Sequence, residues 1–220
     1  MTALFVTATG TDIGKSFVTA GIIRELRRQG RAVAALKPVM SGFAVDAAEA
    51  SDAGILLTAL GKPVDPAEID RIAPWRFAAP LSPDMAAAKE GRSIAFETLV
   101  GFSRQAIATA QDALLIEGVG GVMVPLDDRR TVLDWIAAIG VPALLVAGSY
   151  LGTISHTLTA LDSLFVREMN VLAVIVSETP GSTVPLEETV AAISRFAEPV
   201  IALPRARPGA APDFGRLFGG

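Results

Sequence analysis

Short apolar runs and helix-periodic segments alternate along the chain. The apolar runs predict buried strands at residues 4–7, 32–36, 113–116, 143–147, 171–176 and 200–203. The segments with helical periodicity or capping signals predict helices at residues 15–29, 47–60, 83–90, 96–110, 131–139, 153–168 and 186–196. Residues 62–81 contain several prolines and are expected to be irregular.

This alternation favours one α/β domain over residues 1–220. We expect a doubly wound, mostly parallel sheet with helices on both faces. The residues after Pro204 include Gly209, Pro212 and a terminal pair of glycines. Residues 205–220 are therefore expected to form a tail that is flexible in part.

The composition narrows the classes of function. The 220 residues are 51% hydrophobic, include no cysteine and carry a formal net charge of −4. Without cysteine the chain forms neither disulfides nor thiolate metal sites. The negative charge and the lack of a basic stripe argue against a general nucleic-acid binder. We find no secretory signal and no apolar run long enough to span a membrane, so we expect no membrane association and a cytoplasmic location.

The first apolar run ends in a loop that closes on Gly14, Lys15 and Ser16, and a helical pattern follows. In this strand-loop-helix context the triplet predicts a phosphate-binding loop of the P-loop NTPase type. Backbone N–H groups would surround a polyphosphate, Lys15 would reach its β- and γ-phosphates, and the Ser16 hydroxyl would hold Mg²⁺. The usual spacing places the first glycine at Thr9, whereas this chain has Gly10 one position later. A chance triplet at a helix N-terminus is the alternative.

Polar residues follow the predicted strands, at the sheet edge where ligands bind in such folds. Glu117 follows a buried run and precedes glycines, which suits a Mg²⁺ ligand opposite a phosphate loop; a solvent-facing carboxylate is the alternative. Lys37, followed by Pro38, could bind a phosphate or a carboxylate, or be solvated. Asp52, taken alone, is more typical of a charge at a helix N-terminus than of a metal ligand.

Several short motifs occur in a fixed order along the chain. They are F-V-T-A-T-G-T-D-I-G-K-S at 5–16, K-P-V-M-S-G at 37–42, S-D-A at 51–53, P-L-S-P at 80–83, I-E-G-V-G-G at 116–121, D-W at 134–135 and L-G-T-I-S-H at 151–156. Each motif is modest alone, but the ordered set is specific. Over about residues 3–204 the chain resembles the dethiobiotin synthetase family of ATP-dependent ligases.

The resemblance implies a reaction in biotin synthesis. The partners would be 7,8-diaminononanoate, CO₂ and ATP, with Mg²⁺ as the cofactor. The diamine would be carboxylated to a carbamate, activated as a carbamic-phosphoric anhydride and closed to dethiobiotin. The resemblance also implies a homodimer with the active site at its interface.

The resemblance assigns roles by position. Catalytic roles would fall to Thr11, Lys15 and Lys37. Nucleotide binding would involve Asp12, Ile13, Gly14, Lys15, Ser16, Phe17, Glu117, Ser177, Glu178 and Pro204. The metal would be held by Ser16, Asp52 and Glu117. Substrate would contact Thr11, Lys37, Ser41 and Ser82, and a partner helix would present Gly152, Thr153 and Ser155 to its carboxylate.

Some positions depart from the family pattern. Ala8 replaces a glycine in the loop, and Ser155 replaces an asparagine, which would weaken binding of the substrate carboxylate. Ser177 and Glu178 stand where an Asn-Asp pair would read the adenine edge. An ionised Glu178 accepts hydrogen bonds but donates none, so base selectivity would be loose or supplied by backbone near Pro204.

Two other classes of protein share this type of sheet. A partitioning-type ATPase switch usually carries a second lysine early in the loop, whereas this loop has only Lys15. A catalytically inactive regulatory module should have lost Lys37, Asp52 or Glu117, and all are present. His156 and Asp12 stay open as groups for proton transfer, although packing and loop geometry are the simpler roles.

Overall fold

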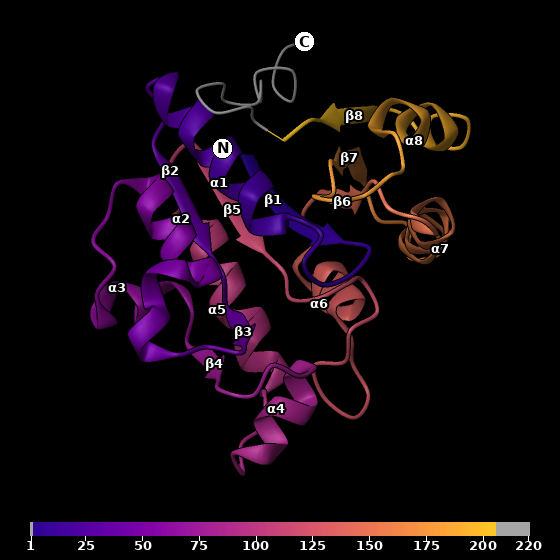
Figure 1. Ribbon diagram of the computed structural model, residues 1–220. Helices are drawn as coiled ribbons and strands as arrows, with labels where there is room; N and C mark the ends of the chain where they lie inside the picture. Colours follow the sequence, from indigo (N-terminus) through magenta and orange to yellow (C-terminus); the bar gives the residue numbers. More distant parts are fainter. Residues whose placement is uncertain (1, 206–220) are drawn as a thin grey trace.

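Six parallel strands form the central sheet of the computed structural model, which describes residues 2–205 (Figure 1). They are β1 (Thr2–Ala8), β2 (Val33–Leu36), β5 (Ala113–Glu117), β6 (Ala143–Gly148), β7 (Val171–Ser177) and β8 (Val200–Leu203). Their order across the sheet is β2-β5-β1-β6-β7-β8, and all neighbouring pairs are parallel. The predicted α/β fold with a parallel sheet is confirmed.

Helices lie on both sides of this sheet (Figure 1). They are α1 (Lys15–Arg28), α2 (Asp52–Leu60), α3 (Pro66–Ile72), α4 (Pro83–Lys89), α5 (Phe96–Thr109), α6 (Val132–Ile139), α7 (Thr153–Val166) and α8 (Leu186–Ile193), with a 3₁₀ helix η1 (Val45–Ala50). The chain crosses from β1 through α1 to β2 and returns through α5 to β5, in the opposite direction. Because such crossovers are right-handed, α1 and α5 lie on opposite faces. This reversal beside β1 marks the ligand site at the carboxyl ends of the strands.

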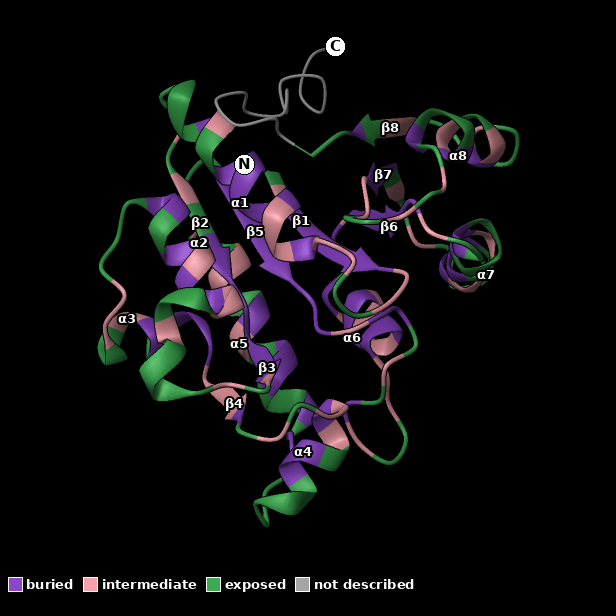
Figure 2. Cartoon of the chain, in the orientation of Figure 1, coloured by how far each residue is buried: buried purple, intermediate pink, exposed green. Residues whose placement is uncertain are grey.

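The core lies between the sheet and its helices, and the strands are largely buried (Figure 2). Every residue of β5 and β6 is buried, as their continuous apolar runs predict. Trp135 of α6 is fully buried and packs edge-to-face on Phe5, with ring centroids 4.8 Å apart. Its Nε1 donates to Ser103 Oγ of α5 at 3.0 Å, so the one polar atom of this side chain is satisfied.

Two local predictions were wrong, and one short strand was not predicted. The helix expected from residue 47 begins at Asp52, because the Ser51 side chain caps it by accepting the backbone N–H of Gly54. The expected irregular stretch contains α3 and β4 (Trp75–Phe77), and Asp65 caps α3 ahead of a proline in its first turn. The short strand β3 (Val39–Ser41) pairs with β4 in a second, parallel sheet.

The predicted tail lies outside the described residues from position 206 onward. Within residues 2–205, none of the helices is both long and apolar enough to cross a membrane.

A capping box at the start of α6 gives a pH-dependent prediction. The Asp134 carboxylate accepts the Thr131 backbone N–H at 2.8 Å and pairs with Arg167 at 2.9 Å. Partial burial acts to raise the pKa of Asp134, but the bonds from Thr131 and Arg167 outweigh it and lower the pKa. We expect Asp134→Asn to cost about 1 kcal/mol of unfolding free energy at pH 7. Because the folded pKa is depressed, this difference should be full above about pH 3.9 and shrink below it.

Urea unfolding of both proteins at several pH values between 3 and 7 measures this difference. Asp128→Asn, on an exposed loop residue, is the control. A cost that stays constant down to the lowest pH would show that the charge of Asp134 contributes nothing.

Candidate nucleotide and phosphoryl-transfer site

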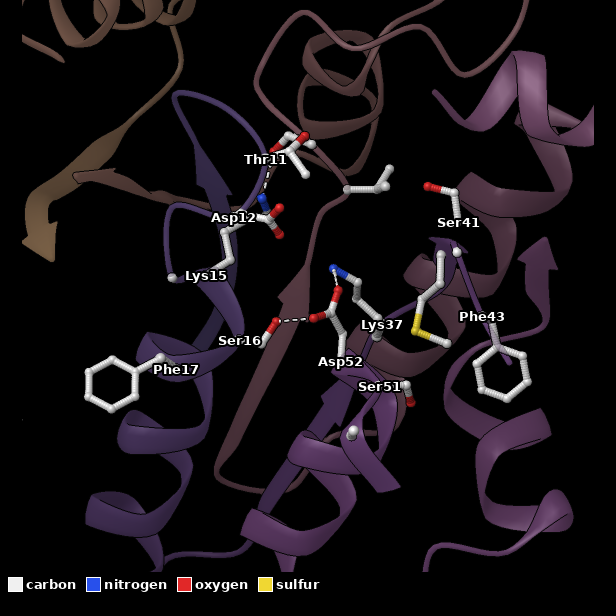
Figure 3. Close-up of a pocket in the computed structure, with 16 residues that line it drawn as sticks. Thr11, Asp12, Lys15, Ser16, Phe17, Lys37, Ser41, Phe43, Ser51 and Asp52 are labelled. Carbon is white, nitrogen blue, oxygen red and sulfur yellow. Dashed lines mark hydrogen bonds and ion pairs between the residues drawn. The ribbon is translucent and has the colours of Figure 1, made fainter. Parts of the chain in front are cut away.

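A cavity of about 420 Å³ opens at the carboxyl ends of the central strands (Figure 3). It is lined by four segments that are far apart in the sequence. These segments contribute Thr11, Asp12, Gly14, Lys15, Ser16 and Phe17; Lys37, Met40, Ser41, Gly42 and Phe43; Ala50, Ser51 and Asp52; and Val119 and Gly120. The fold therefore brings the predicted phosphate loop together with the residues that follow β2 and β5.

The loop between β1 and α1 has the geometry of an anion cradle. Gly14 precedes α1 with a φ of +103°, and a Cβ there would lie 3.0 Å from Ser177 Oγ, so this turn requires glycine. No side chain caps the N-terminus of α1, which leaves its first backbone N–H groups available to a ligand. Gly121 lies against the loop from the other side, and a Cβ there would approach the Thr9 backbone to 3.2 Å.

Lys15 is folded back onto this cradle. Its Nζ donates to Gly10 O at 3.0 Å and to Gly120 O at 2.8 Å. Burial and the charge of Lys37 lower the pKa of Lys15 to about 8, so it is mostly protonated at neutral pH. A phosphate that displaced these two carbonyls would meet an ammonium group already at the loop.

Lys37 is the buried cation of the site. It is 1% exposed, and its Nζ lies 2.7 Å from each of Glu117 Oε1, Asp52 Oδ2 and Gly118 O. These three acceptors satisfy all three N–H groups of the ammonium. Burial acts to lower the pKa of Lys37, but the carboxylates of Glu117 and Asp52 outweigh it and raise the pKa. Lys37 therefore carries a fixed positive charge at the cavity floor.

The oxygen atoms around Ser16 fit a magnesium ion. Ser16 Oγ lies 2.6 Å from Asp52 Oδ1 and 2.7 Å from Glu117 Oε1. Lys37 and Ser16 lower the pKa of Asp52 despite its burial, so the carboxylate is ionised. Glu117 is fully buried, and its Oε2 has no hydrogen-bond partner among the described residues.

Two carboxylates and one hydroxyl do not make a complete metal cage. In the described part of the chain no group of three or more His, Cys, Asp or Glu side chains could hold a metal. Mg²⁺ is usually bound by one or two carboxylates, with waters and substrate phosphates filling the other positions. The donor set next to the phosphate cradle therefore fits Mg²⁺ held jointly with a nucleotide.

The other predicted residues are divided between this cavity and other parts of the structure. Thr11, Asp12, Phe17 and Ser41 line the same cavity, whereas Ile13 and Ser82 do not. Ser177 packs against Gly14, and Glu178 and Pro204 border a second hollow of about 480 Å³ with Arg205 and residues 182–187.

Gly152, Thr153 and Ser155 lie at the N-terminus of α7, and none of them lines the cavity. The Thr153 hydroxyl is buried and donates to Gly148 O at 2.7 Å, so within this chain it stabilises the turn. His156 Nδ1 lies 2.9 Å from the Tyr150 hydroxyl, near the same helix end.

Sequence reasoning missed the backbone partners of Lys15, and it left Arg205 open between a place over the nucleotide and solvent. The carbonyl groups of Gly10 and Gly120 have no side-chain signature, so no sequence pattern identifies them. Arg205 lies with its guanidinium 5.6 Å from the centroid of the Phe17 ring. Met40 and Phe43 also line the cavity, and their place in the segment after β2 could have identified them from the sequence.

Solved structures with this fold are distant in sequence. A MinC–MinD cell division complex from Aquifex aeolicus matches with a TM-score of 0.55 at 15% identity, over 94% of this chain and 82% of that one. Chloroplast FtsY from Physcomitrella patens also gives 0.55, at 14% identity, over 99% of this chain but only 63% of that longer chain. These likenesses support the fold alone.

Sequence comparison identifies the family. Residues 2–205 match the family model described as an AAA domain. A protein of Methylobacterium nodulans named ATP-dependent dethiobiotin synthetase is 51% identical over 203 residues, which are 90% of each chain. One of the same name from Acidiphilium cryptum is 50% identical over 190 residues, 86% of this chain and 85% of the relative. The chain therefore belongs to the ATP-dependent dethiobiotin synthetase family.

Proposed function

We propose that this chain, acting as one ligase domain, uses ATP and Mg²⁺ to carboxylate 7,8-diaminononanoate and close it to dethiobiotin. The relatives are named ATP-dependent dethiobiotin synthetases. This name describes a ligase that forms carbon–nitrogen bonds at the expense of ATP. The observation that carries the proposal is the buried Lys37, which lies between Glu117 and Asp52 on the floor of the phosphate cradle.

The proposed reaction has three steps. One amine of the substrate adds to CO₂, forms a C–N bond and releases a proton to give a carbamate. A carbamate oxygen then attacks the γ-phosphorus of ATP, so a P–O bond forms and ADP leaves. The second amine attacks the carbamate carbon and forms the second C–N bond. The bond between this carbon and the phosphate oxygen breaks, phosphate leaves, and a proton is lost as the ring closes. The balance is diamine, CO₂ and ATP in, and dethiobiotin, ADP and phosphate out.

The residues around the cavity would act through charge. A carbamate and a triphosphate repel each other, and the Lys15 and Lys37 ammonium groups would lie between them and stabilise charge that develops in phosphoryl transfer. The Thr11 and Ser41 hydroxyls, which line the cavity, would hydrogen-bond the carbamate. Mg²⁺, held by Ser16, Asp52 and Glu117, would neutralise charge on the phosphate oxygens.

The nucleotide would lie along the loop. Backbone N–H groups of residues 12–17 would bind its phosphates at the N-terminus of α1. The base would extend past Phe17 toward Ser177, Glu178 and Pro204, where the second hollow opens.

The substrate tail would bind at a subunit interface. Gly152, Thr153 and Ser155 of a partner would present a helix N-terminus to its carboxylate. The helix α7 and the turn before it support an interface, because large apolar side chains there are exposed. They are Leu151, Ile154, Phe165 and Val166, and Leu151 is 91% exposed.

Introducing a charged side chain on this surface tests whether it forms the interface of a homodimer. We expect Leu151→Asp to convert a dimer into a monomer in analytical ultracentrifugation and to lower turnover at least about tenfold, because a charge would be buried without a partner. Phe196→Asp, at a residue 62% exposed near the end of α8, is the control and should change neither. An unchanged sedimentation coefficient for Leu151→Asp would place the interface elsewhere.

The activity itself is tested by phosphate release from ATP with bicarbonate and Mg²⁺, with and without 7,8-diaminononanoate. We expect release that depends on the diamine, with dethiobiotin detected by mass spectrometry. Slow release that ignores the diamine would favour a nucleotide switch or a regulatory module of the same fold.

A further inference from the structure

Three hydrogen bonds join Glu178, the residue after β7, to the last residue of β8 and to Arg205. The Glu178 backbone N–H donates to Leu203 O at 2.9 Å, which extends the pairing of the two strands. Glu178 Oε2 accepts the backbone N–H of Arg205 at 2.7 Å, and the Glu178 carbonyl accepts Arg205 Nε at 3.1 Å. We call this set of bonds the Glu178 clamp, and it fixes both the backbone and the side chain of Arg205.

The clamp directs Arg205 toward the phosphate loop. The guanidinium lies over the ring of Phe17, a residue that lines the phosphate cavity, while Arg205 itself borders the second hollow. Arg205 thus contacts a lining residue of the phosphate cavity and itself lines the second hollow. A planar guanidinium over an aromatic ring offers a stacking surface and several N–H donors.

The two residues at the expected base-reading positions are engaged by other parts of the chain, although Glu178 borders the second hollow. Ser177 is 1% exposed, packs against Gly14 and lines neither space. The Glu178 carboxylate has one oxygen occupied by the Arg205 backbone. Its direct role is therefore to hold a loop segment.

We propose that Glu178 is a positioning residue, which keeps Arg205 over Phe17 as a wall of the nucleobase site and does not read the base edge. The inference rests on the proposed nucleotide site. It implies weak discrimination between nucleotides that differ only at position 6 of the purine. A carboxylate that read adenine would accept its amino group and repel the carbonyl of hypoxanthine, whereas the clamp senses neither group.

Calorimetric binding of ADP and IDP, each with Mg²⁺, tests this without turnover. We expect the wild-type Kd values for the two nucleotides to agree within about tenfold. Glu178→Ala should weaken both by about fivefold, because Arg205 then spends only part of its time in place. The ratio of the two Kd values should stay unchanged. With ATP as substrate the effect should appear in KM and not in kcat.

Three further variants sharpen the test. Glu178→Gln keeps an oxygen that can accept the Arg205 N–H, so it should restore most of the affinity. Arg205→Ala keeps the backbone bond but removes the wall, so it should weaken ADP and IDP alike. Glu188→Ala removes an exposed carboxylate of α8 that lines neither space, and it is the matched control.

Two results would overturn the inference. The first is a wild-type preference for ADP over IDP above about a hundredfold that Glu178→Ala abolishes, which would make Glu178 a base reader. The second is wild-type affinity for both nucleotides in Glu178→Ala. Because the probes are ADP and IDP, a lack of diamine-dependent turnover would count against the proposed reaction alone.

Discussion

Lys37→Met should lower dethiobiotin formation by about 10²–10³-fold while leaving ADP binding within a few-fold of wild type. This is the loss seen when a single charged or hydrogen-bonding group is removed from a developing transition-state charge. Lys37 is 1% exposed and holds its charge between two carboxylates, so its ammonium group is fixed in position. Methionine has a similar length without the charge, so it tests the charge and not the volume.

The same substitution should also affect stability. It leaves Glu117, fully buried, without its cation, and breaking a buried pair in this way costs about 3–5 kcal/mol. Mg²⁺ with ADP should restore part of the loss, because the metal would compensate the same carboxylates. Thermal unfolding with and without Mg²⁺ and ADP therefore separates misfolding from lost chemistry.

Lys62→Met provides the matched control. Lys62 pairs with Glu68 at the surface, with its side chain 43% exposed, and such pairs contribute little. It should change neither turnover nor stability measurably. If Lys37→Met turned over substrate at the wild-type rate with ADP still bound, Lys37 would have no role on the carbamate side.

The sheet could be predicted from the sequence because its strands are buried on both faces. Continuous apolar runs such as 113–116 and 143–147 have few alternatives, and the structure shows strands there with every residue buried. The errors cluster in the segment between β2 and α4, where single polar side chains decide the local structure. Ser51 and Asp65 each begin a helix through one side-chain bond, and the apolar pattern carries no trace of it.

The site could be predicted only as far as strand order allows. Lys37 follows β2 and Glu117 ends the neighbouring parallel strand β5, so their meeting at one edge follows from the fold. Asp52 joins them from α2. The position of Asp52 in the sequence did not indicate a metal ligand, and only the family resemblance assigned it that role. The Glu178 clamp could not be predicted, because it depends on the path of the backbone after β8.

Glu117→Gln should raise the Mg²⁺ concentration needed for half-maximal turnover by about 10–100-fold. Glu117 contributes Oε1 to Ser16 and Lys37, while Oε2 is buried without a partner in the described residues. An amide in this place removes a charge from the donor set and replaces one oxygen by an N–H donor, so it lowers metal affinity in two ways. The effect should exceed that of Asp52→Asn, because the Asp52 side chain is 44% exposed and water can replace its oxygen.

Two titrations distinguish a metal ligand from a residue that only holds Lys37. The first follows turnover against Mg²⁺, and the second follows ADP affinity against Mg²⁺ by calorimetry, which needs no catalysis. Glu97→Gln, at a surface residue with its side chain 80% exposed, serves as the control. A metal ligand shifts both curves to higher Mg²⁺ and recovers activity at saturation. If Glu117→Gln lowers turnover at every Mg²⁺ concentration and shifts neither curve, Glu117 acts through the position of Lys37 and the metal is held by other oxygens.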